Sequence, residues 1–147
     1  GRIVTEVLGA GAGEVACVEI DADNGNDLER QGHSVLVADF LGVSADTMTC
    51  DAVAMNPPFT RNQDIQHVRH AFACLRPGGR LASIVSEHGF AGNERECTEW
   101  RDWLRSLSAK IEIIPAGAFK KSGTSIQTRM IVVTKGTYIL DSRNGIG

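Results

Sequence analysis

Four consecutive residues, Asn56-Pro57-Pro58-Phe59, have the side chains in this sequence that are best suited to chemistry. The Asn56 amide and the Pro57 carbonyl both offer oxygen atoms that accept hydrogen bonds, and the Phe59 ring offers a face for stacking. Together these groups suit a planar heterocycle with an exocyclic amine, such as adenine. The alternative is a tight turn capped by Asn56, with Phe59 in the core, because Asn and Pro are ordinary turn residues.

The residues before this motif predict the element that positions it. Asp51 is followed by the apolar run Ala52-Val53-Ala54-Met55, which is typical of a buried strand. The strand must end at the prolines, since neither can donate a hydrogen bond to a ladder. Ligands bind at the C-terminal ends of strands in open α/β sheets, so we expect the motif to be displayed there.

Composition and charge limit the classes of protein. A chain of 147 residues with 42% apolar residues predicts one domain, residues 1–147. A net charge of −3 disfavours coating nucleic acid by bulk charge but allows a local basic face. No apolar run approaches the ~20 residues that span a membrane, and the first residues have no signal-peptide pattern. The scattered cysteines, Cys17, Cys50, Cys74 and Cys97, suggest free thiols in a reducing compartment, so we expect a cytoplasmic protein.

Two acids and three glycines near the start of the chain are candidate ligand contacts. Residues 3–8 predict a strand that opens into Gly9, Gly11 and Gly13, whose backbone could approach a ligand closely. A plain flexible turn is the alternative. Glu19 lies near the end of the next predicted strand, residues 16–21, where an acid can accept both ribose hydroxyl hydrogens. The alternative for Glu19 is an acid that faces solvent.

A third predicted strand, residues 33–38, ends at Asp39 and Phe40. This pair could hold a second flat ring, with Asp39 at the edge of that ring and Phe40 against its face. It could equally be a helix cap followed by a core aromatic residue. Residues 27–31 before this strand predict a short helix that Gly32 ends.

The remaining segments predict alternating helices and strands. Helical spacing covers residues 65–75, where His67 and His70 are three apart and are expected to face solvent or DNA rather than bind a metal. A turn at residues 76–80 precedes a strand at 81–86. Asn93 and Glu96 predict a capping box for a helix that places Trp100 and Trp103 in the core. Two β-branched runs, 111–114 and 129–134, have no helix between them and should pair antiparallel. The order of these strands and helices predicts a doubly wound α/β sheet, mostly parallel, with an antiparallel C-terminal strand.

The Asn-Pro-Pro-Phe motif is similar to the catalytic motif of amino-methyltransferases, above all of the DNA adenine-N(6) methyltransferases. Other motifs follow the usual order of that fold, and residues 119–124 resemble the late loop of phage- and plasmid-type members. The resemblance extends from Ile3 to Thr134 and implies the Rossmann-like S-adenosylmethionine-dependent methyltransferase fold. The ordered motifs are Gly11-x-Gly13, Glu19, Asp39-Phe40 and Pro77-Gly78-Gly79.

This resemblance implies transfer of a methyl group from S-adenosylmethionine to the amino group of a flipped adenine in DNA, with no metal required. Asn56, Pro57, Pro58 and Phe59 would be catalytic. The cofactor would be bound by Gly9, Gly11, Gly13, Glu19, Asp39 and Phe40, and DNA phosphates by Arg61, Arg69, Lys120 and Lys121. Other interpretations are an RNA-base or protein-glutamine methyltransferase, or a catalytically degenerate binding module with this fold.

Two features depart from the family pattern. Only the seven residues Gly9 to Val15 connect the first two predicted strands, whereas a parallel crossover needs a dozen or more. We therefore expect the first crossover helix to be missing near residue 13. The structure should show either a chain break between Gly9 and Val18 or first strands that are not joined normally. Glu6 is also followed by Val7, where the family has proline. No target-recognition domain fits within 147 residues, so a separate specificity subunit is a possible partner, and the oligomeric state stays open.

Overall fold

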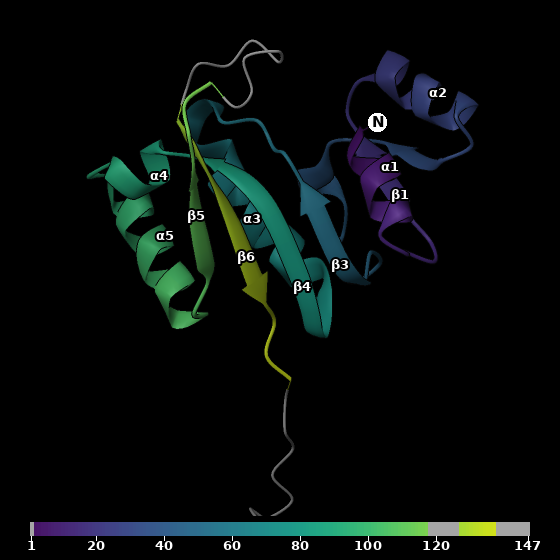
Figure 1. The fold of residues 1–147 in the computed structure, drawn as a ribbon. Helices are drawn as coiled ribbons and strands as arrows, with labels where there is room; N and C mark the ends of the chain where they lie inside the picture. The colour runs from purple at the N-terminus through teal and green to yellow at the C-terminus, as the bar shows by residue number, and fades with distance from the viewer. Residues whose placement is uncertain (1, 118–126, 138–147) are drawn as a thin grey trace, which may run out of the picture.

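The structure, a computed structural model, describes residues 2–117 and 127–137 (Figure 1). Its helices are α1 (Arg2–Gly9), α2 (Ala22–Arg30), α3 (Gln63–Cys74), α4 (His88–Ala91) and α5 (Arg95–Ser106). Its strands are β1 (Ala16–Glu19), β2 (Ser34–Val37), β3 (Cys50–Met55), β4 (Leu75–Ser86), β5 (Lys110–Ile114) and β6 (Thr128–Thr134). Two short 3₁₀ turns are η1 (Phe40–Gly42) and η2 (Thr60–Asn62). The described helices include none that is long and apolar enough to cross a membrane.

The strands form two separate sheets. The larger sheet has the order β3-β4-β6-β5, in which β6 runs antiparallel to both of its neighbours. The smaller sheet is the parallel pair β1-β2. The α/β class, the mixed sheet with an antiparallel last strand and the antiparallel pairing of the two β-branched runs are confirmed. Among the described residues, the predicted doubly wound sheet is divided in two, because β1-β2 does not pair with β3.

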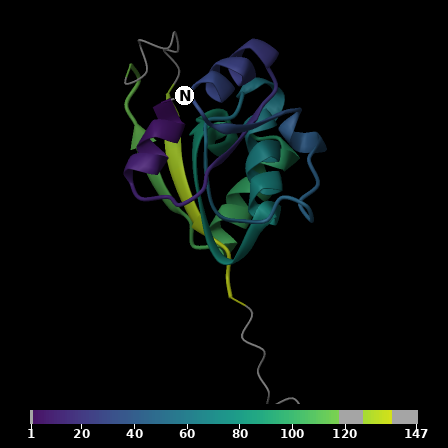
Figure 2. The same cartoon turned by 90° about the vertical axis from the view of Figure 1, so that its right-hand side faces the viewer.

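The core lies between the larger sheet and two helices, α3 and α5, which lie on the same side of it (Figure 2). α3 contributes Ile65, Val68 and Ala71, and α5 contributes Trp100 and Leu104, at the spacings that place side chains on one helix face. Alternate residues of β4 and β6 complete this core: Leu81, Val85, Ile131 and Val133. The apolar stripes of both helices are thus confirmed.

The two tryptophans of α5 belong to this core, as predicted. Trp100 is 1% exposed, and its ring stacks on that of Trp103 at a centroid distance of 5.5 Å. The predicted capping box is wrong, however. α5 begins at Arg95 with Glu94 in the capping position, and Glu96 accepts a hydrogen bond from Asn62 Nδ2 at 2.8 Å instead of closing a box with Asn93.

The strand predicted for residues 3–8 is wrong, because this segment is the helix α1. Val4, Val7 and Leu8 fall on neighbouring turns of one helix face, and Val4 is buried. A strand here would need a crossover to reach β1 in parallel, and the short connection cannot supply one. With α1 in place, no described strand precedes β1, so the connection joins a helix to a strand, and the missing crossover helix stays a prediction.

Residues 76–80, which were predicted to form a turn before the strand, belong to β4, so this strand begins at Leu75 rather than at residue 81. The pairing with β3 shifts there, from Cys50 opposite Leu75 to Ala52 opposite Arg80. A Cβ at Gly79 would lie 2.8 Å from the Arg76 carbonyl oxygen and 3.0 Å from that of Asp51. Only glycine allows this close approach of three backbone segments.

Candidate functional site

The Asn-Pro-Pro-Phe motif follows the C-terminal end of β3, as predicted. β3 ends at Met55, which lies opposite Ser83 of the parallel strand β4. Asn56 is exposed, Pro57 is buried and Phe59 is partly buried. The Asn56 amide is therefore open to a ligand at the edge where the parallel strands β3 and β4 end.

The chain leaves this motif through a strained turn. Arg61 and Asn62 have φ angles of 55° and 57°, so two successive residues other than glycine are left-handed. Each such residue costs on the order of 1–3 kcal/mol, less for Asn, which tolerates this region. The bond from Asn62 to Glu96 of α5 helps to hold the turn. Backbone strain of this kind clusters at functional sites. The two prolines of the motif did not by themselves predict the strained turn.

Asp64 is a buried carboxylate that sequence reasoning missed. It lies in the first turn of α3, is 1% exposed, and accepts a hydrogen bond from the Ser86 backbone N–H at 2.8 Å through Oδ2. Its Oδ1 has no hydrogen-bond partner among the described residues. Asp64 thereby joins the start of α3 to the end of β4, beside the motif. The signal for it was an acid in the first helical turn, where the helix dipole favours negative charge.

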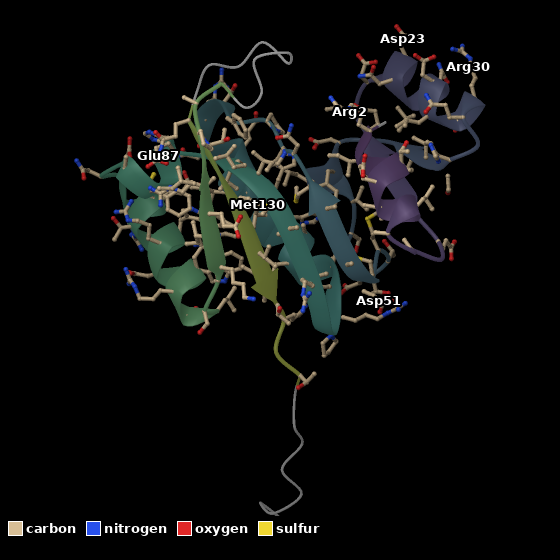
Figure 3. The ribbon with its side chains drawn as sticks, in the orientation of Figure 1. Arg2, Asp23, Arg30, Asp51, Glu87 and Met130 are labelled. Atoms are coloured by element: carbon tan, nitrogen blue, oxygen red, sulfur yellow. The ribbon has the colours of Figure 1, made fainter. Side chains whose placement is uncertain are left out.

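A second feature that was missed is the ion pair between Glu87 and Arg129. Glu87, which Figure 3 labels, lies at the end of the sheet where α4 begins. Arg129 donates to both carboxylate oxygens, from Nε at 2.8 Å and from Nη2 at 2.6 Å. These bonds lower the pKa of Glu87 from its ordinary value. The Arg129 guanidinium also lies 4.2 Å from the centre of the Phe90 ring. The partners are 42 residues apart, so no local pattern could have found the pair.

The two predicted cofactor acids lie at neighbouring strand ends in the smaller sheet. Glu19 ends β1 and pairs with Val37, the last residue of β2, and Asp39 follows two residues later. The Glu19 side chain is partly exposed, and one of its oxygens accepts a hydrogen bond from the Asp21 N–H at 3.0 Å. An ionised carboxylate has several acceptor sites, so this side chain can accept a hydroxyl hydrogen in addition to the Asp21 N–H.

Asp39 and Phe40 have the local roles of a cap and a packed aromatic residue. Asp39 Oδ1 accepts the Leu41 N–H at 3.1 Å and caps η1. The Phe40 ring lies 5.9 Å from that of His67 and 4.9 Å from that of His70, which connects the smaller sheet to α3. Both histidines are partly buried, so neither is fully open to solvent, and the expectation that they face solvent or DNA stays a prediction. Neither belongs to a metal-binding group among the described residues.

The glycine loop ends a helix instead of following a strand. Gly11 has a φ of +96°, and its N–H donates to the Leu8 carbonyl while the Ala12 N–H donates to that of Val7. These two bonds form a Schellman motif, in which a left-handed glycine follows the helix. A Cβ added at Gly9, Gly11 or Gly13 would meet no atom within 4 Å. The predicted context of this loop is therefore wrong, and a role of its glycines in cofactor binding stays a prediction.

The predicted phosphate contacts are only partly described. Arg61 is exposed directly after the motif. Arg69 is exposed on α3, where its guanidinium lies 5.2 Å from the centre of the Trp103 ring. Lys120 and Lys121 lie outside the described residues. The structure thus places one basic side chain next to the motif and one on the adjoining helix.

No protein-family model and no curated protein matches the chain, but solved structures do. A protein from Listeria monocytogenes assigned to the class I S-adenosylmethionine-dependent methyltransferases is 17% identical, with a TM-score of 0.64 over 97% of this chain and 51% of that one. The chain has a methyltransferase fold. The M protein of the type I restriction enzyme EcoKI is 23% identical, with a TM-score of 0.58 over 74% of this chain and 26% of that one.

A third structure with the methyltransferase fold contains a bound product of the cofactor. The plantazolicin methyltransferase BpumL, in complex with SAH, is 8% identical, with a TM-score of 0.59 over 92% of this chain and 72% of that one. The chain spans about a quarter of the EcoKI M protein and about half of the Listeria protein. At these identities the likeness shows the fold, and the chemistry must be argued from the site.

Proposed function

We propose that this chain catalyses transfer of a methyl group from S-adenosylmethionine to the exocyclic amino group of adenine in DNA. The observation that supports it most is the position of Asn56-Pro57-Pro58-Phe59 in a methyltransferase fold, at the C-terminal end of β3. The amide of Asn56 is exposed there, and the strained turn at Arg61 and Asn62 follows at once.

The motif supplies what this reaction needs at the nitrogen atom. The amine of adenine is a poor nucleophile because its lone pair is delocalised into the ring. Hydrogen bonds from the amine to the Asn56 side-chain oxygen and the Pro57 carbonyl oxygen favour a tetrahedral nitrogen. They also stabilise the positive charge that grows there as the methyl group is transferred, in the manner of preorganised groups in an oxyanion hole. Holding amine and methyl in line supplies much of the remaining rate enhancement.

The cofactor contacts in this proposal come from the smaller sheet. Glu19 would accept the ribose hydroxyl hydrogens, and Asp39 and Phe40 would hold the cofactor's adenine by its edge and face. Glu19 fits this role because it ends β1 beside the end of β2 and its carboxylate is only partly buried. S-adenosylmethionine supplies the activated methyl group. The SAH complex of BpumL, which has the same fold, supports this choice of cofactor.

The substrate contacts come from the motif and from basic side chains. A duplex hides the adenine amine, so the base must be flipped out of the stack, and the Phe59 ring would stack on it. Arg61 and Arg69, with Lys120 and Lys121, would contact phosphates, which position DNA without reading its sequence. The similarity to the M protein of a type I restriction enzyme supports a separate subunit that selects the DNA sequence.

One observation favours a second candidate function, a methyltransferase-fold binding module without catalysis. The segment expected to present the glycine loop from a strand is the helix α1, and the loop amides at Gly11 and Ala12 close that helix. A module of this kind would retain the Asn-Pro-Pro-Phe edge as a binding surface but would not hold the cofactor.

Product analysis tests these functions against one another. The protein is incubated with S-adenosylmethionine labelled in its methyl group and with duplex DNA, RNA or a protein extract, and the labelled products are hydrolysed and identified. We expect N(6)-methyladenine in the DNA. Label in RNA bases or in glutamine side chains would replace DNA as the substrate. Absence of transfer together with absence of cofactor binding would support the binding module.

A further inference from the structure

Three side chains outside the candidate active site converge between α4 and the start of α5. They are His88, Glu94 and Cys97, and each offers one atom that can bind a metal. His88 Nε2 lies 3.4 Å from Glu94 Oε1, and all three donor atoms lie within 4.8 Å of one another. Cys97 is fully buried, whereas the other two side chains are more than half exposed, so the group opens to solvent on one side.

These separations approach those of a tetrahedral zinc site. Zinc binds sulfur at about 2.3 Å and nitrogen or oxygen at about 2.0–2.2 Å, so its donor atoms lie roughly 3.3–3.7 Å apart. The distance from His88 to Glu94 already has this value. The widest separation must close by about 1 Å, which rotation of the exposed His88 and Glu94 side chains can provide. A thiolate with an imidazole favours zinc over magnesium or calcium, which prefer oxygen alone.

Gly92 gives independent support for a built site. Its φ of −64° and ψ of 149° are open to any residue, so its backbone does not require glycine. An added Cβ would nevertheless lie 2.5 Å from Glu94 Oε2 and 2.8 Å from Cys97 Sγ. The same Cβ would lie 2.9 Å from the His88 carbonyl oxygen, so glycine allows the chain to approach α4 closely and also keeps the space between the donor atoms available.

The backbone around these donors is held by Arg101. Its Nη1 donates to the carbonyl oxygens of Gly89, Phe90 and Gly92, at 3.1, 3.3 and 2.8 Å. The segment between the end of α4 and the start of α5 is therefore fixed in the conformation that brings Glu94 and Cys97 beside His88. A backbone that is already fixed lowers the entropy that is lost when a metal binds.

We propose that His88, Glu94 and Cys97 bind a zinc ion, with the fourth position left to water. The carboxylate and the thiolate balance the charge of the ion, and neutral His88 completes the three protein ligands. The ion would join α4 to α5. α4 follows Glu87 at the end of β4, and α5 holds the strained turn through Glu96. The site would thus stabilise the packing of α4 and α5 beside the candidate active site. Metal binding there does not depend on the proposed methyl transfer.

Cobalt(II) is a suitable probe, because a cobalt–thiolate bond absorbs in the near ultraviolet and tetrahedral cobalt absorbs in the visible. The metal-free protein is titrated with cobalt and then with zinc. We expect both absorptions to appear at one equivalent of cobalt and to disappear as zinc replaces it. Cys97→Ser should remove the thiolate band, and His88→Gln should weaken zinc binding at least about tenfold, the effect of disturbing a metal site. Cys17→Ser, which changes a thiol in the smaller sheet, should leave both unchanged.

Two results would overturn this site. One is a cobalt spectrum without a thiolate band in the wild-type protein, which would leave a hydrogen-bonded cluster. The other is a band that persists in Cys97→Ser, which would assign the metal to another thiol. Circular dichroism checks that each variant is folded. Because His88 is exposed, His88→Gln provides a test even if replacement of the buried thiol prevents folding.

Discussion

The segment from β3 to β6 buries its apolar side chains far more completely than the segment from α1 to β2. Among the described residues, the buried hydrophobic side chains lie between Ile65 and Val133, with Val4 as the exception. Of the large hydrophobic side chains that are exposed among the described residues, five lie in the earlier segment, Ile3, Leu8, Ile20, Leu36 and Val37, and two lie in the later one, Ile111 and Ile113 of β5. The half that has the Asn-Pro-Pro-Phe motif therefore has its own core, and the half that has the cofactor acids does not.

The difference has a physical origin in the sheet. The half that binds substrate in our proposal has four paired strands covered by α3 and α5. The cofactor half has a two-stranded sheet, and two strands alone are marginally stable in water. α1 occupies the sequence position of the missing strand. In our proposal, the catalytic motif is thus supported by a core, whereas cofactor binding depends on the part of the molecule that has no core of its own.

The largest expected effect is on stability, in a pair of substitutions that compares the two halves. Trp100→Ala should lower the free energy of unfolding by about 3–5 kcal/mol, because it leaves a large cavity in the core. Ile20→Ala should change it by no more than about 0.5 kcal/mol, because Ile20 is 71% exposed. Urea denaturation followed by far-ultraviolet circular dichroism measures both. Equal losses of unfolding free energy in the two variants would contradict the difference between the two halves.

The next largest effect concerns the chemical step. Asn56→Ala should lower the rate of single-turnover methyl transfer by about 10²–10³, as does the loss of one preorganised hydrogen bond to a developing charge. Ala54→Gly, on the exposed part of β3, is a control that should lower the rate far less. If Asn56→Ala methylates at the wild-type rate, the motif is only a turn.

A smaller effect is expected for the stacking residue. Phe59→Ala should weaken binding of a flipped base by about 1–3 kcal/mol, the contribution of base–aromatic stacking. Phe59→Trp keeps an aromatic face and should retain much of the affinity. Fluorescence of 2-aminopurine placed at the target position reports flipping. An equal loss in both variants would mean that the ring packs in the core and does not contact the base.

The smallest effect is the pH dependence of the pair between Glu87 and Arg129. The bonds from Arg129 lower the pKa of Glu87 in the folded protein. The pair therefore stabilises the fold at pH values above 4.5, the ordinary pKa of a glutamate side chain. This contribution, about 1 kcal/mol or less for a partly exposed pair, is lost as the pH falls through the folded pKa. Glu87→Gln should remove that part of the acid dependence of stability, as measured by urea denaturation from pH 6 to pH 3. Identical pH profiles of stability for Glu87→Gln and the wild-type protein would contradict this prediction.

Sequence reasoning was most successful where a side-chain period and a tertiary role agree. The apolar faces of α3 and α5 could be predicted, because burial enforces their period. The strand before Asn56 was also predicted, but the expectation that it is buried is wrong, because all its residues are partly or fully exposed. Residues 3–8 have apolar, β-branched side chains that suit either element, and the short connection to β1 decided for a helix. Of the site, the motif edge and the position of Glu19 could be predicted. The orphaned oxygen of Asp64 and the ion pair at Glu87 depend on distant contacts, which no local pattern contains.

Calorimetric titration with S-adenosylmethionine tests the proposed function most directly, because it depends on the half of the molecule that lacks a core. We expect the wild-type protein to bind one equivalent. Glu19→Ala should weaken binding by about 1.5–3 kcal/mol, the range for hydrogen bonds to a charged group, and Asn56→Ala should leave it nearly unchanged. Unchanged affinity in Glu19→Ala would remove this residue from the site. Absence of binding by the folded wild-type protein would contradict the proposed methyl transfer and favour the binding module.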